Sequence, residues 1–389
     1  MASPGELRSA GQDAAALGIL PAGSPPEVGG GLPFASYAGL SPEELDARIG
    51  AARAELGRDL LLLCHHYQQD DVYKFADLTG DSFKLARLAA ERTDARWIVF
   101  CGVHFMAESA DVLTGPDQTV ILPDMAAGCS MADMADLASV ETAWNELDEL
   151  GLAADVMPVT YMNSAADLKA FCGERGGIVC TSSNAEAVLR WSFERKRRVL
   201  FFPDQHLGRN TGRRMGIPLE EMRVWDPQRE YGGSQPREVE RARMLLWMGH
   251  CSVHQIFQPQ HVDWFRKEHP DVRVLVHPEC RMEVVDRADL VGSTEFIIRT
   301  VSEADPGTTW AVGTEVHLVN RLRDAFPDRA VHFLSPTVCM CSTMYRIDPE
   351  HLCWALENLR EGGVVNPIRV PEPVARWARV ALQRMLEVR

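Results

Sequence analysis

The feature that most constrains this chain of 389 residues is an order of segments that occurs three times. Each copy opens with an apolar segment ending in polar residues, and these segments read LLLLCHHY, DVMPVTYMN and VRVLVHPE. A segment of helical pattern beginning at Ser or Thr follows, then a second apolar segment that leads to a histidine, then a polar turn that carries a cysteine. Alternation of strands and helices favours parallel sheets that are covered by helices.

The spacing of equivalent residues supports a true repeat. The equivalent strand ends, helix starts, histidines and cysteines are His65, Tyr161 and His277; Ser82, Ser182 and Thr294; His104, His206 and His317; and Cys129, Cys251 and Cys341. Strand ends and helix starts are 17, 21 and 17 residues apart, and the next steps are 22, 24 and 23 residues. The last steps are 25, 45 and 24 residues, so only the second copy contains a long insertion.

These repeats predict an α/β chain with three homologous αβα sandwich domains. We expect repeats at 39–140, 141–258 and 259–389, with the insertion near 209–240 and C-terminal helices after the third repeat. Residues 1–38 are rich in Gly, Pro, Ala and Ser, which predicts a disordered N-terminal tail. Because ligands of parallel sheets bind beyond the carboxyl ends of the strands, three repeats would place three such ends around one axis.

Composition narrows the classes of function. Lys and Arg number 40 and Asp and Glu number 55, giving a net charge of −15, which argues against nucleic acid as a partner. No apolar run approaches the roughly 20 residues of a membrane span, and the N-terminus does not resemble a secretion signal. We therefore expect a cytoplasmic protein without a membrane partner, whose ten cysteines are thiols or metal ligands rather than disulfides.

The three repeated cysteines, Cys129, Cys251 and Cys341, are candidate metal ligands. The chain has no close C-x₂-C pair of the kind found in zinc ribbons and ferredoxins. Three thiolates that meet on an axis could hold three irons of a cubane, which would leave the fourth iron open as a Lewis acid. Two alternatives stay open: three unrelated core cysteines, or a zinc site at Cys251 and His254.

Polar residues at the helix starts and strand ends form two further candidate sets. Ser82, Ser182 and Thr294 lie where backbone N–H groups are unpaired, which suits carboxylates or phosphate, although plain N-capping would place the same residue types there. The strand-end set, which suits acid–base chemistry, comprises His65, His66, Tyr67, Tyr161, Asn163, His277 and Glu279. For the repeated histidines, structural hydrogen bonding is the favoured interpretation.

Ten motifs resemble the quinolinate synthase family in its own order. They are HHYQQDDVYKFADLTGDS, FCGVHFMAESADVL, PDMAAGCSMAD, VTYMNS, CTSSNA, FFPDQHLG, GHCSVHQ, HPEC, GSTEFI and CSTMYRID, and they cover about 60 to 360. The resemblance implies three αβα domains about a pseudo-threefold axis, with the active site at the centre. It also implies condensation of iminoaspartate with dihydroxyacetone phosphate to quinolinate, phosphate and water in NAD biosynthesis. An L-aspartate oxidase or dehydrogenase would supply the iminoaspartate.

The resemblance also implies residue roles. One [4Fe–4S] cluster per chain would have Cys129, Cys251 and Cys341 as its protein ligands. The implied catalytic residues are Glu279, His65, Tyr67 and Tyr161. The implied substrate-binding residues are His65, Ser82, Tyr161, Met162, Asn163, Ser182, His277, Pro278, Glu279 and Thr294.

Two departures from the family pattern leave questions open. His66 stands where the family often has Asn, so its role is not assigned. Cys339 is a rival of Cys341 in the doubled Cys339-Met340-Cys341. Two other classes of function are kept as alternatives: another iron–sulfur hydro-lyase, and a non-enzymatic iron–sulfur sensor.

Overall fold

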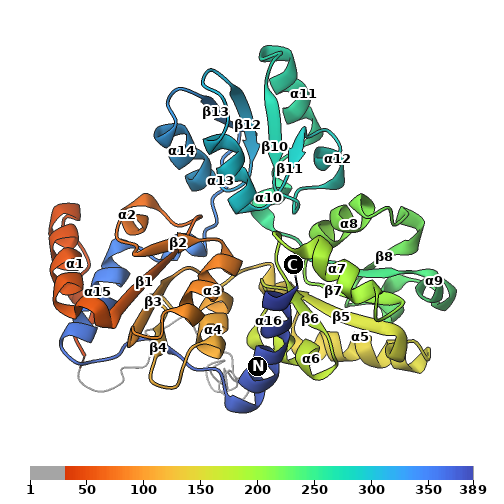
Figure 1. Cartoon of the computed structure of the whole chain (residues 1–389), viewed down its shortest axis with the longest axis horizontal. Coiled ribbons are helices and arrows are strands. Elements are labelled where there is room, and N and C mark those ends of the chain that lie inside the picture. The colour runs from red at the N-terminus through yellow and green to blue at the C-terminus, as the bar shows by residue number, and fades with distance from the viewer. Residues whose placement is uncertain (1–30, 389) are drawn as a thin grey trace, which may run out of the picture.

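The first strand of each repeat is an inner strand of a sheet, with a neighbour on each side, in the computed structural model, which describes residues 31–388. These strands are β1 (Leu60–His65), β5 (Val156–Tyr161) and β10 (Arg273–Val276), and nearly every residue in them is buried. Continuous apolar runs of this kind suit parallel strands that helices cover on both faces. The predicted α/β class is therefore confirmed, and Figure 1 shows three units that meet near the centre. The threefold axis itself stays a prediction.

All three sheets share one strand order. Their common part is β2-β1-β3-β4 in the first unit, β6-β5-β7-β9 in the second and β11-β10-β12-β13 in the third. All of these neighbours pair in parallel, so the carboxyl ends of the strands lie at one edge of each sheet. The repeat read from the sequence is thus a repeat of topology.

The elements of the first unit are β1, β2 (Leu78–Gly80), β3 (Trp97–Cys101), β4 (Thr119–Ile121), β14 (Pro367–Ile368), α1 (Pro42–Leu56), α2 (Asp70–Tyr73), α3 (Ser82–Glu91), α4 (His104–Leu113) and α15 (Pro349–Arg360). The elements of the second unit are β5, β6 (Ile178–Cys180), β7 (Arg198–Phe202), β8 (Met222–Trp225), β9 (Met244–Trp247), α5 (Leu137–Glu149), α6 (Ala166–Glu174), α7 (Ala185–Phe193), α8 (Gln205–Arg214), α9 (Pro236–Arg241), α10 (Ser252–Gln255) and α16 (Glu372–Glu387).

The elements of the third unit are β10, β11 (Leu290–Val291), β12 (Thr309–Gly313), β13 (Ala330–Phe333), α11 (Pro259–Glu268), α12 (Met282–Val285), α13 (Thr294–Ser302) and α14 (Val316–Ala325). Short 3-10 helices lie at η2 (Phe34–Ser36), η3 (Gly57–Asp59), η4 (Ala132–Met134), η5 (Ala153–Asp155), η6 (Leu219–Glu221), η7 (Glu230–Gly233) and η8 (Met344–Arg346). Within the described residues, no helix combines the length and the apolar character that a membrane span requires.

The insertion and the C-terminal segment extend two of the sheets. The insertion in the second unit supplies β8, which adds a parallel edge strand beside β9. After the third sheet the chain returns to the first unit, where α15 packs against α1 and β14 pairs antiparallel with β4. The last helix, α16, packs against α6 and β6 of the second unit and against α4 of the first. The C-terminal helices, grouped with the third repeat in the sequence, therefore lie against the other two units.

Residues 31–38 pack on α15. Most of the segment predicted as a tail, residues 1–30, lies outside the described residues. The side chain of Tyr37 is fully buried, and its hydroxyl donates a hydrogen bond to Glu357 Oε2 at 2.7 Å. The backbone N–H of Leu32 donates to Asn358 Oδ1, and Trp354 Nε1 donates to the Leu32 carbonyl. This end of the predicted tail is thus part of the first unit.

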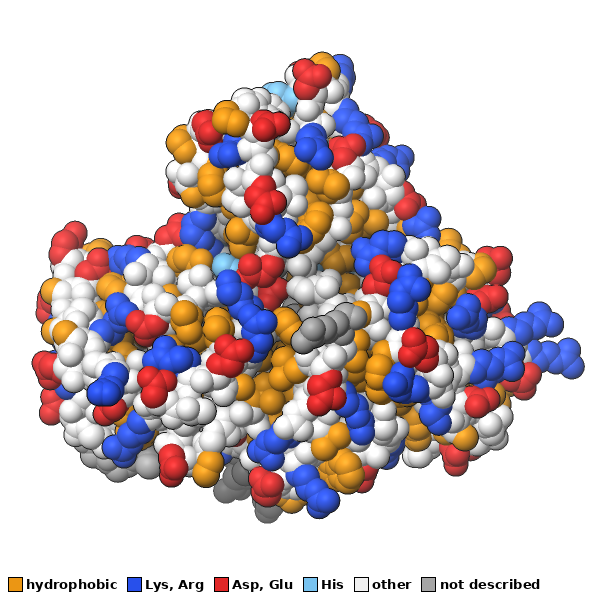
Figure 2. Space-filling model, in the orientation of Figure 1, with side chains coloured by type: hydrophobic (Ala, Val, Ile, Leu, Met, Phe, Trp, Pro, Cys, Tyr) orange, Lys and Arg blue, Asp and Glu red, His pale blue; other side chains and the backbone are white. Residues whose placement is uncertain are grey.

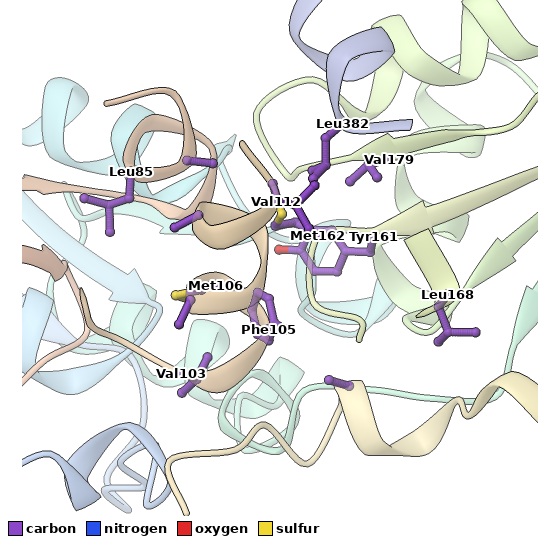
Figure 3. Packing of buried hydrophobic residues seen from close by; sticks show 14 of the residues in the cluster. Leu85, Val103, Phe105, Met106, Val112, Tyr161, Met162, Leu168, Val179 and Leu382 are labelled. Carbon is purple, nitrogen blue, oxygen red and sulfur yellow. The ribbon is translucent and has the colours of Figure 1, made fainter. Parts of the chain in front are cut away.

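One apolar core runs through the first and second units. Figure 3 shows side chains of α4 and neighbouring elements of the first unit facing those of the second, with Leu382 of α16 close to Val179. The third unit has two separate clusters, which lie around Val276 and around Val312. Tyr67 packs against both the shared core and one of these clusters.

Candidate functional site

The carboxyl ends of the central strands line one cavity. Residues from all three units contribute, as expected for ligands that bind beyond the ends of parallel strands. The predicted site residues that line it are His65, Tyr67, Ser82, Cys129, Tyr161, Asn163, Ser182, Cys251, His277, Glu279, Thr294 and Cys341.

Among the substrate-binding residues that the resemblance implies, Met162 and Pro278 do not line the cavity, and His66 of the strand-end set does not line it either. The side chain of Met162 is fully buried, and its Sδ accepts a hydrogen bond from Ser109 Oγ at 3.5 Å. The carbonyl of Pro278 accepts a hydrogen bond from Asn210 Nδ2 at 2.9 Å. Met162 and Pro278 adjoin lining residues in the chain, and their roles as substrate contacts stay predictions.

The helix starts are capped by the residues before Ser82 and Thr294. Asp81 caps α3 by accepting from the N–H of Lys84, and Ser293 caps α13 by accepting from the N–H of Phe296. Plain N-capping, the alternative considered for the helix-start residues, therefore does not explain Ser82 or Thr294. In the second unit α7 begins only at Ala185, so Ser182 lies in the turn before the helix. All three hydroxyl-bearing residues line the cavity.

Three cysteines from three different turns converge on this cavity, whereas Cys339 does not line it. Burial, together with the neighbouring Cys341, raises the pKa of the Cys129 thiol to about 12. Burial raises the pKa of Cys251 as well, with added contributions from Glu279, Cys341 and Cys129. Buried thiols that disfavour one another's ionisation become stable thiolates when a cation lies between them. The donor set therefore fits a shared metal group, and Cys341 rather than Cys339 belongs to it.

The zinc alternative has a weaker basis. Cys251, His254 and Glu279 have potential ligand atoms within 4.8 Å of one another. However, His254 Nδ1 lies only 2.8 Å from Glu279 Oε2, which is a direct contact between the two side chains. Glu279 Oε1 in turn accepts a hydrogen bond from the Tyr161 hydroxyl at 2.5 Å. Two of these three groups thus already have protein partners.

Glu279 is a buried carboxylate held by partners from the second unit. Burial alone would raise its pKa, but the nearby His277 and His254 and the hydrogen bonds from His254 and Tyr161 outweigh burial. The pKa of Glu279 is consequently held at about 2, so the group is ionised near neutral pH. Burial and the charge of Glu279 raise the pKa of Tyr161, which keeps its hydroxyl proton available for donation.

His65 and His277 occupy equivalent positions and have the same hydrogen-bond arrangement. Nδ1 of His65 accepts from the backbone N–H of Tyr67 at 3.1 Å, and Nδ1 of His277 accepts from that of Glu279 at 3.4 Å. Burial lowers the pKa of each imidazole to about 3. Both rings are therefore neutral, and Nε2 carries the proton that each can donate to a ligand.

Tyr67 connects the first unit to the third. Its hydroxyl lies 3.0 Å from Thr294 Oγ1 and 2.8 Å from Thr314 Oγ1. Thr314 Oγ1 also lies 3.4 Å from His254 Nε2. Polar contacts thus run from Tyr67 through Thr314 and His254 to Glu279.

Several lining residues were not identified from the sequence. They are Asp81, Phe83, Val103, Phe105, Met106, Met131, Thr181, Val253 and Met344, whereas His254, which also lines the cavity, was considered only as a zinc ligand. Most adjoin a predicted residue, and Phe105 and Met106 follow the repeated His104, so proximity to repeat positions was the available signal. His104, His206 and His317 themselves do not line the cavity. His104 Nδ1 lies 3.7 Å from Glu108, but His206 Nδ1 and His317 Nε2 have no hydrogen-bond partner within the described residues.

Similarity to known proteins identifies the family. The family described as quinolinate synthetase A protein matches residues 47–387. This chain belongs to that family. A quinolinate synthase of Rhodopirellula baltica is 57% identical over 95% of this chain and 99% of its own length. One of Herpetosiphon aurantiacus is 58% identical over 90% of this chain and 94% of its own length. The resemblance read from the ten motifs is therefore confirmed, and the chain is an enzyme of the quinolinate synthase family.

Proposed function

We propose that this enzyme condenses iminoaspartate with dihydroxyacetone phosphate to give quinolinate, phosphate and water in NAD biosynthesis. The observation that carries the proposal is that one cavity gathers three cysteines, three hydroxyl-bearing residues near helix starts and a set of acid–base groups. Both substrates are anionic. An overall charge of −15 does not oppose their binding, because the helix starts supply a local field of the opposite sign.

Cys129, Cys251 and Cys341 would hold a [4Fe–4S] cluster. When bound, the cluster supplies a Lewis acid at the iron that has no cysteine ligand. Cys341 lines the cavity and Cys339 does not, which supports Cys341 as the third ligand.

Ser82, Ser182 and Thr294 would bind the carboxylates and the phosphate. The side chains of Ser82 and Thr294 are free of the capping role that Asp81 and Ser293 perform. His65 and His277, neutral because of burial, would donate from Nε2 to substrate oxygens. Such neutral donors orient an anion without pairing with its charge.

Glu279, Tyr161 and Tyr67 would handle protons during phosphate loss, ring closure and dehydration. The Tyr161 hydroxyl donates to Glu279 Oε1 at 2.5 Å, so its oxygen can take a proton from the substrate while its own proton passes to the carboxylate. Tyr67 would act from the first unit, where Thr294 and Thr314 fix its hydroxyl.

The same proposal implies which enzyme supplies a substrate, which partner is excluded and where in the cell the enzyme acts. An L-aspartate oxidase or dehydrogenase would supply iminoaspartate, and nucleic acid would not be a partner. A cytoplasmic location fits a biosynthetic enzyme whose cysteines are thiols or ligands.

The test is quinolinate formation under anaerobic conditions by the wild type and by Glu279→Gln. We expect the variant to lose at least about a hundredfold in turnover while it keeps its iron and sulfide, because the amide preserves shape and removes the charge. Glu303→Gln, at an exposed residue after α13, is the matched control and should be unchanged. A Glu279→Gln variant within about threefold of wild type would overturn the role of Glu279. A wild type with a full cluster but no quinolinate would overturn the proposed function.

A further inference from the structure

Glu295 lies beside a predicted substrate-binding residue and contacts another unit. It follows Thr294 at the start of α13 in the third unit. Its Oε1 lies 2.9 Å from His66 Nε2 and 3.3 Å from Lys84 Nζ, and both of these partners belong to the first unit. Figure 2 shows acidic, basic and histidine side chains gathered where these two units meet.

The position of His66 is fixed at its ring and at its backbone carbonyl. Nδ1 lies 3.2 Å from the Tyr73 hydroxyl, and Arg321 of the third unit donates to the backbone carbonyl of His66. Because Nδ1 faces the Tyr73 hydroxyl, Nε2 is the ring nitrogen that faces Glu295. The side chain of His66 is 7% exposed, which makes this contact less screened than an ordinary surface pair.

A corresponding contact joins the first and second units. Asp81, which precedes Ser82, accepts a hydrogen bond through Oδ2 from Ser183 Oγ at 3.0 Å. Ser183 directly follows Ser182. Each of the three hydroxyl-bearing residues that would bind the anions therefore has a sequence neighbour that forms a contact between units.

The lowered pKa of Glu295 agrees with this geometry. The hydrogen bond with His66 is the largest of the effects that hold the pKa of Glu295 at about 2, and Lys84 adds to it. Glu295 is thus ionised whenever the enzyme is near neutral pH. The Lys84 and Glu295 side chains are 39% and 35% exposed, and an ion pair this exposed contributes only about 0.2–1 kcal/mol to folding, so fold stability alone gives that pair a small role.

We propose that Glu295 is a positioning residue. By contacting His66 and Lys84, it holds the third unit against the first. Thr294 and Ser82 are thereby kept in register for anion binding. The kinetic part of this inference rests on the proposed function. The geometric part, that Glu295 fixes the start of α13 against the first unit, does not. The arrangement also gives His66 a role, which the sequence left unassigned.

The experiment compares two substitutions with matched controls in the full chain. Glu295→Gln keeps the size of the side chain and removes its charge, and Lys84→Met removes one partner. Lys84→Arg keeps the charge and should retain wild-type behaviour. Asp286→Asn is the second control, because Asp286 also pairs between units, with Arg213 at 2.6 Å, but does not line the cavity.

Two readouts are taken from each protein. We expect Glu295→Gln to raise KM for iminoaspartate by about fivefold or more while kcat stays within about threefold, since binding geometry rather than chemistry is altered. We also expect faster hydrogen exchange of the first amides of α13 in Glu295→Gln and Lys84→Met, with or without a cluster. Both controls should match the wild type in both readouts.

Unchanged exchange at α13 in Glu295→Gln and Lys84→Met would overturn the inference, whatever the kinetics. An equal rise of KM in Asp286→Asn would also overturn it, because any pair between units would then have the same effect. If the wild type makes no quinolinate, the proposed function fails, and the exchange measurement still decides whether Glu295 positions α13.

Discussion

The first two units and the third unit are held in different ways. The first two share one apolar core, and α16 spans them: Arg379 donates to the carbonyl of Val112 on one side, and Arg384 donates to that of Gly177 on the other. The third unit encloses its own two clusters. Polar contacts are prominent where it meets the others, among them Tyr161 with Glu279, Tyr67 with Thr294, His66 with Glu295, Arg321 with Asp70, Asn210 with Cys280 and Arg213 with Asp286.

This difference predicts that stability and activity depend on different parts of the molecule. Burial of apolar surface is the main favourable term in folding, so the shared core should dominate the free energy of unfolding. The polar contacts of the third unit include several residues that line the cavity. Substitutions in the shared core should therefore change stability first, whereas substitutions at the polar boundary should change activity first.

The largest loss of stability is expected at Gly173, where α6 meets α16. A Cβ at this position would lie 1.9 Å from the carbonyl oxygen of Trp377, so either helix must shift. We expect Gly173→Ala to lower the free energy of unfolding by about 3 kcal/mol, measured by chemical denaturation. Gly50→Ala in α1, where nothing lies within 4 Å, should instead stabilise by about 0.5–1 kcal/mol. Equal midpoints for the two variants would mean that the contact of α16 with α6 does not support the shared core.

A buried lysine in the same core predicts a dependence on pH. Lys169 is fully buried, and desolvation lowers its pKa to about 8 from 10.5. Between these values the unfolded chain binds more protons, so raising the pH favours the folded state. The free energy of unfolding of the wild type, relative to Lys169→Met, should rise by about 3 kcal/mol as the pH is raised from about 7 to about 10.5, and should be flat below this range. A constant difference across this range would show that Lys169 keeps an ordinary pKa.

Two truncations test the N-terminal contribution to the shared core. Deleting 1–38 removes the hydrogen bonds of Tyr37 with Glu357 and of Leu32 with Asn358, whereas deleting 1–30 leaves them. We expect the longer deletion to be less stable than the shorter one by about 2 kcal/mol, with the same turnover per folded molecule. Equal stability would mean that residues 31–38 add nothing to the first unit.

The smallest change of stability is expected at the polar boundary of the third unit. Asn210 Nδ2 donates to the carbonyls of Pro278 and Cys280 and so fixes the turn that carries His277 and Glu279. Asn210→Ala should reduce turnover about tenfold, because a misplaced catalytic group is costly, while stability falls by about 1 kcal/mol or less. A large loss of stability with normal turnover in the folded fraction would reverse the comparison.

Local patterns predicted much of this architecture. Ser41 caps α1 and Asp348 caps α15, and such cap residues act within one helical turn, so they set helix starts locally. The central strands were identified because they are long and apolar. By contrast, β2, β6 and β11 have only two or three residues, too few to show a period, and they form by pairing with the strand beside them.

Long-range packing explains what the sequence did not predict. The return of α15 and α16 to the first two units depends on matching surfaces such as Gly173 with Trp377, which no local pattern reveals. In the site, the repeat identified Ser82 and Thr294 but not the residues whose side chains cap those helices. His254 adjoins the Cys251 turn, yet its partner Glu279 comes from another unit, so their pairing became visible only in three dimensions.

The central claim is that three cysteines from three units hold a cluster in the cavity where quinolinate forms. Its most direct test is the measurement of iron, sulfide and quinolinate in anaerobically reconstituted wild type, Cys341→Ser and Cys339→Ser. The wild type and Cys339→Ser should each contain about four irons and four sulfides per chain and make quinolinate. Cys341→Ser should lose both the cluster and the product. Loss of the cluster from Cys339→Ser, with retention in Cys341→Ser, would contradict this assignment of the third ligand.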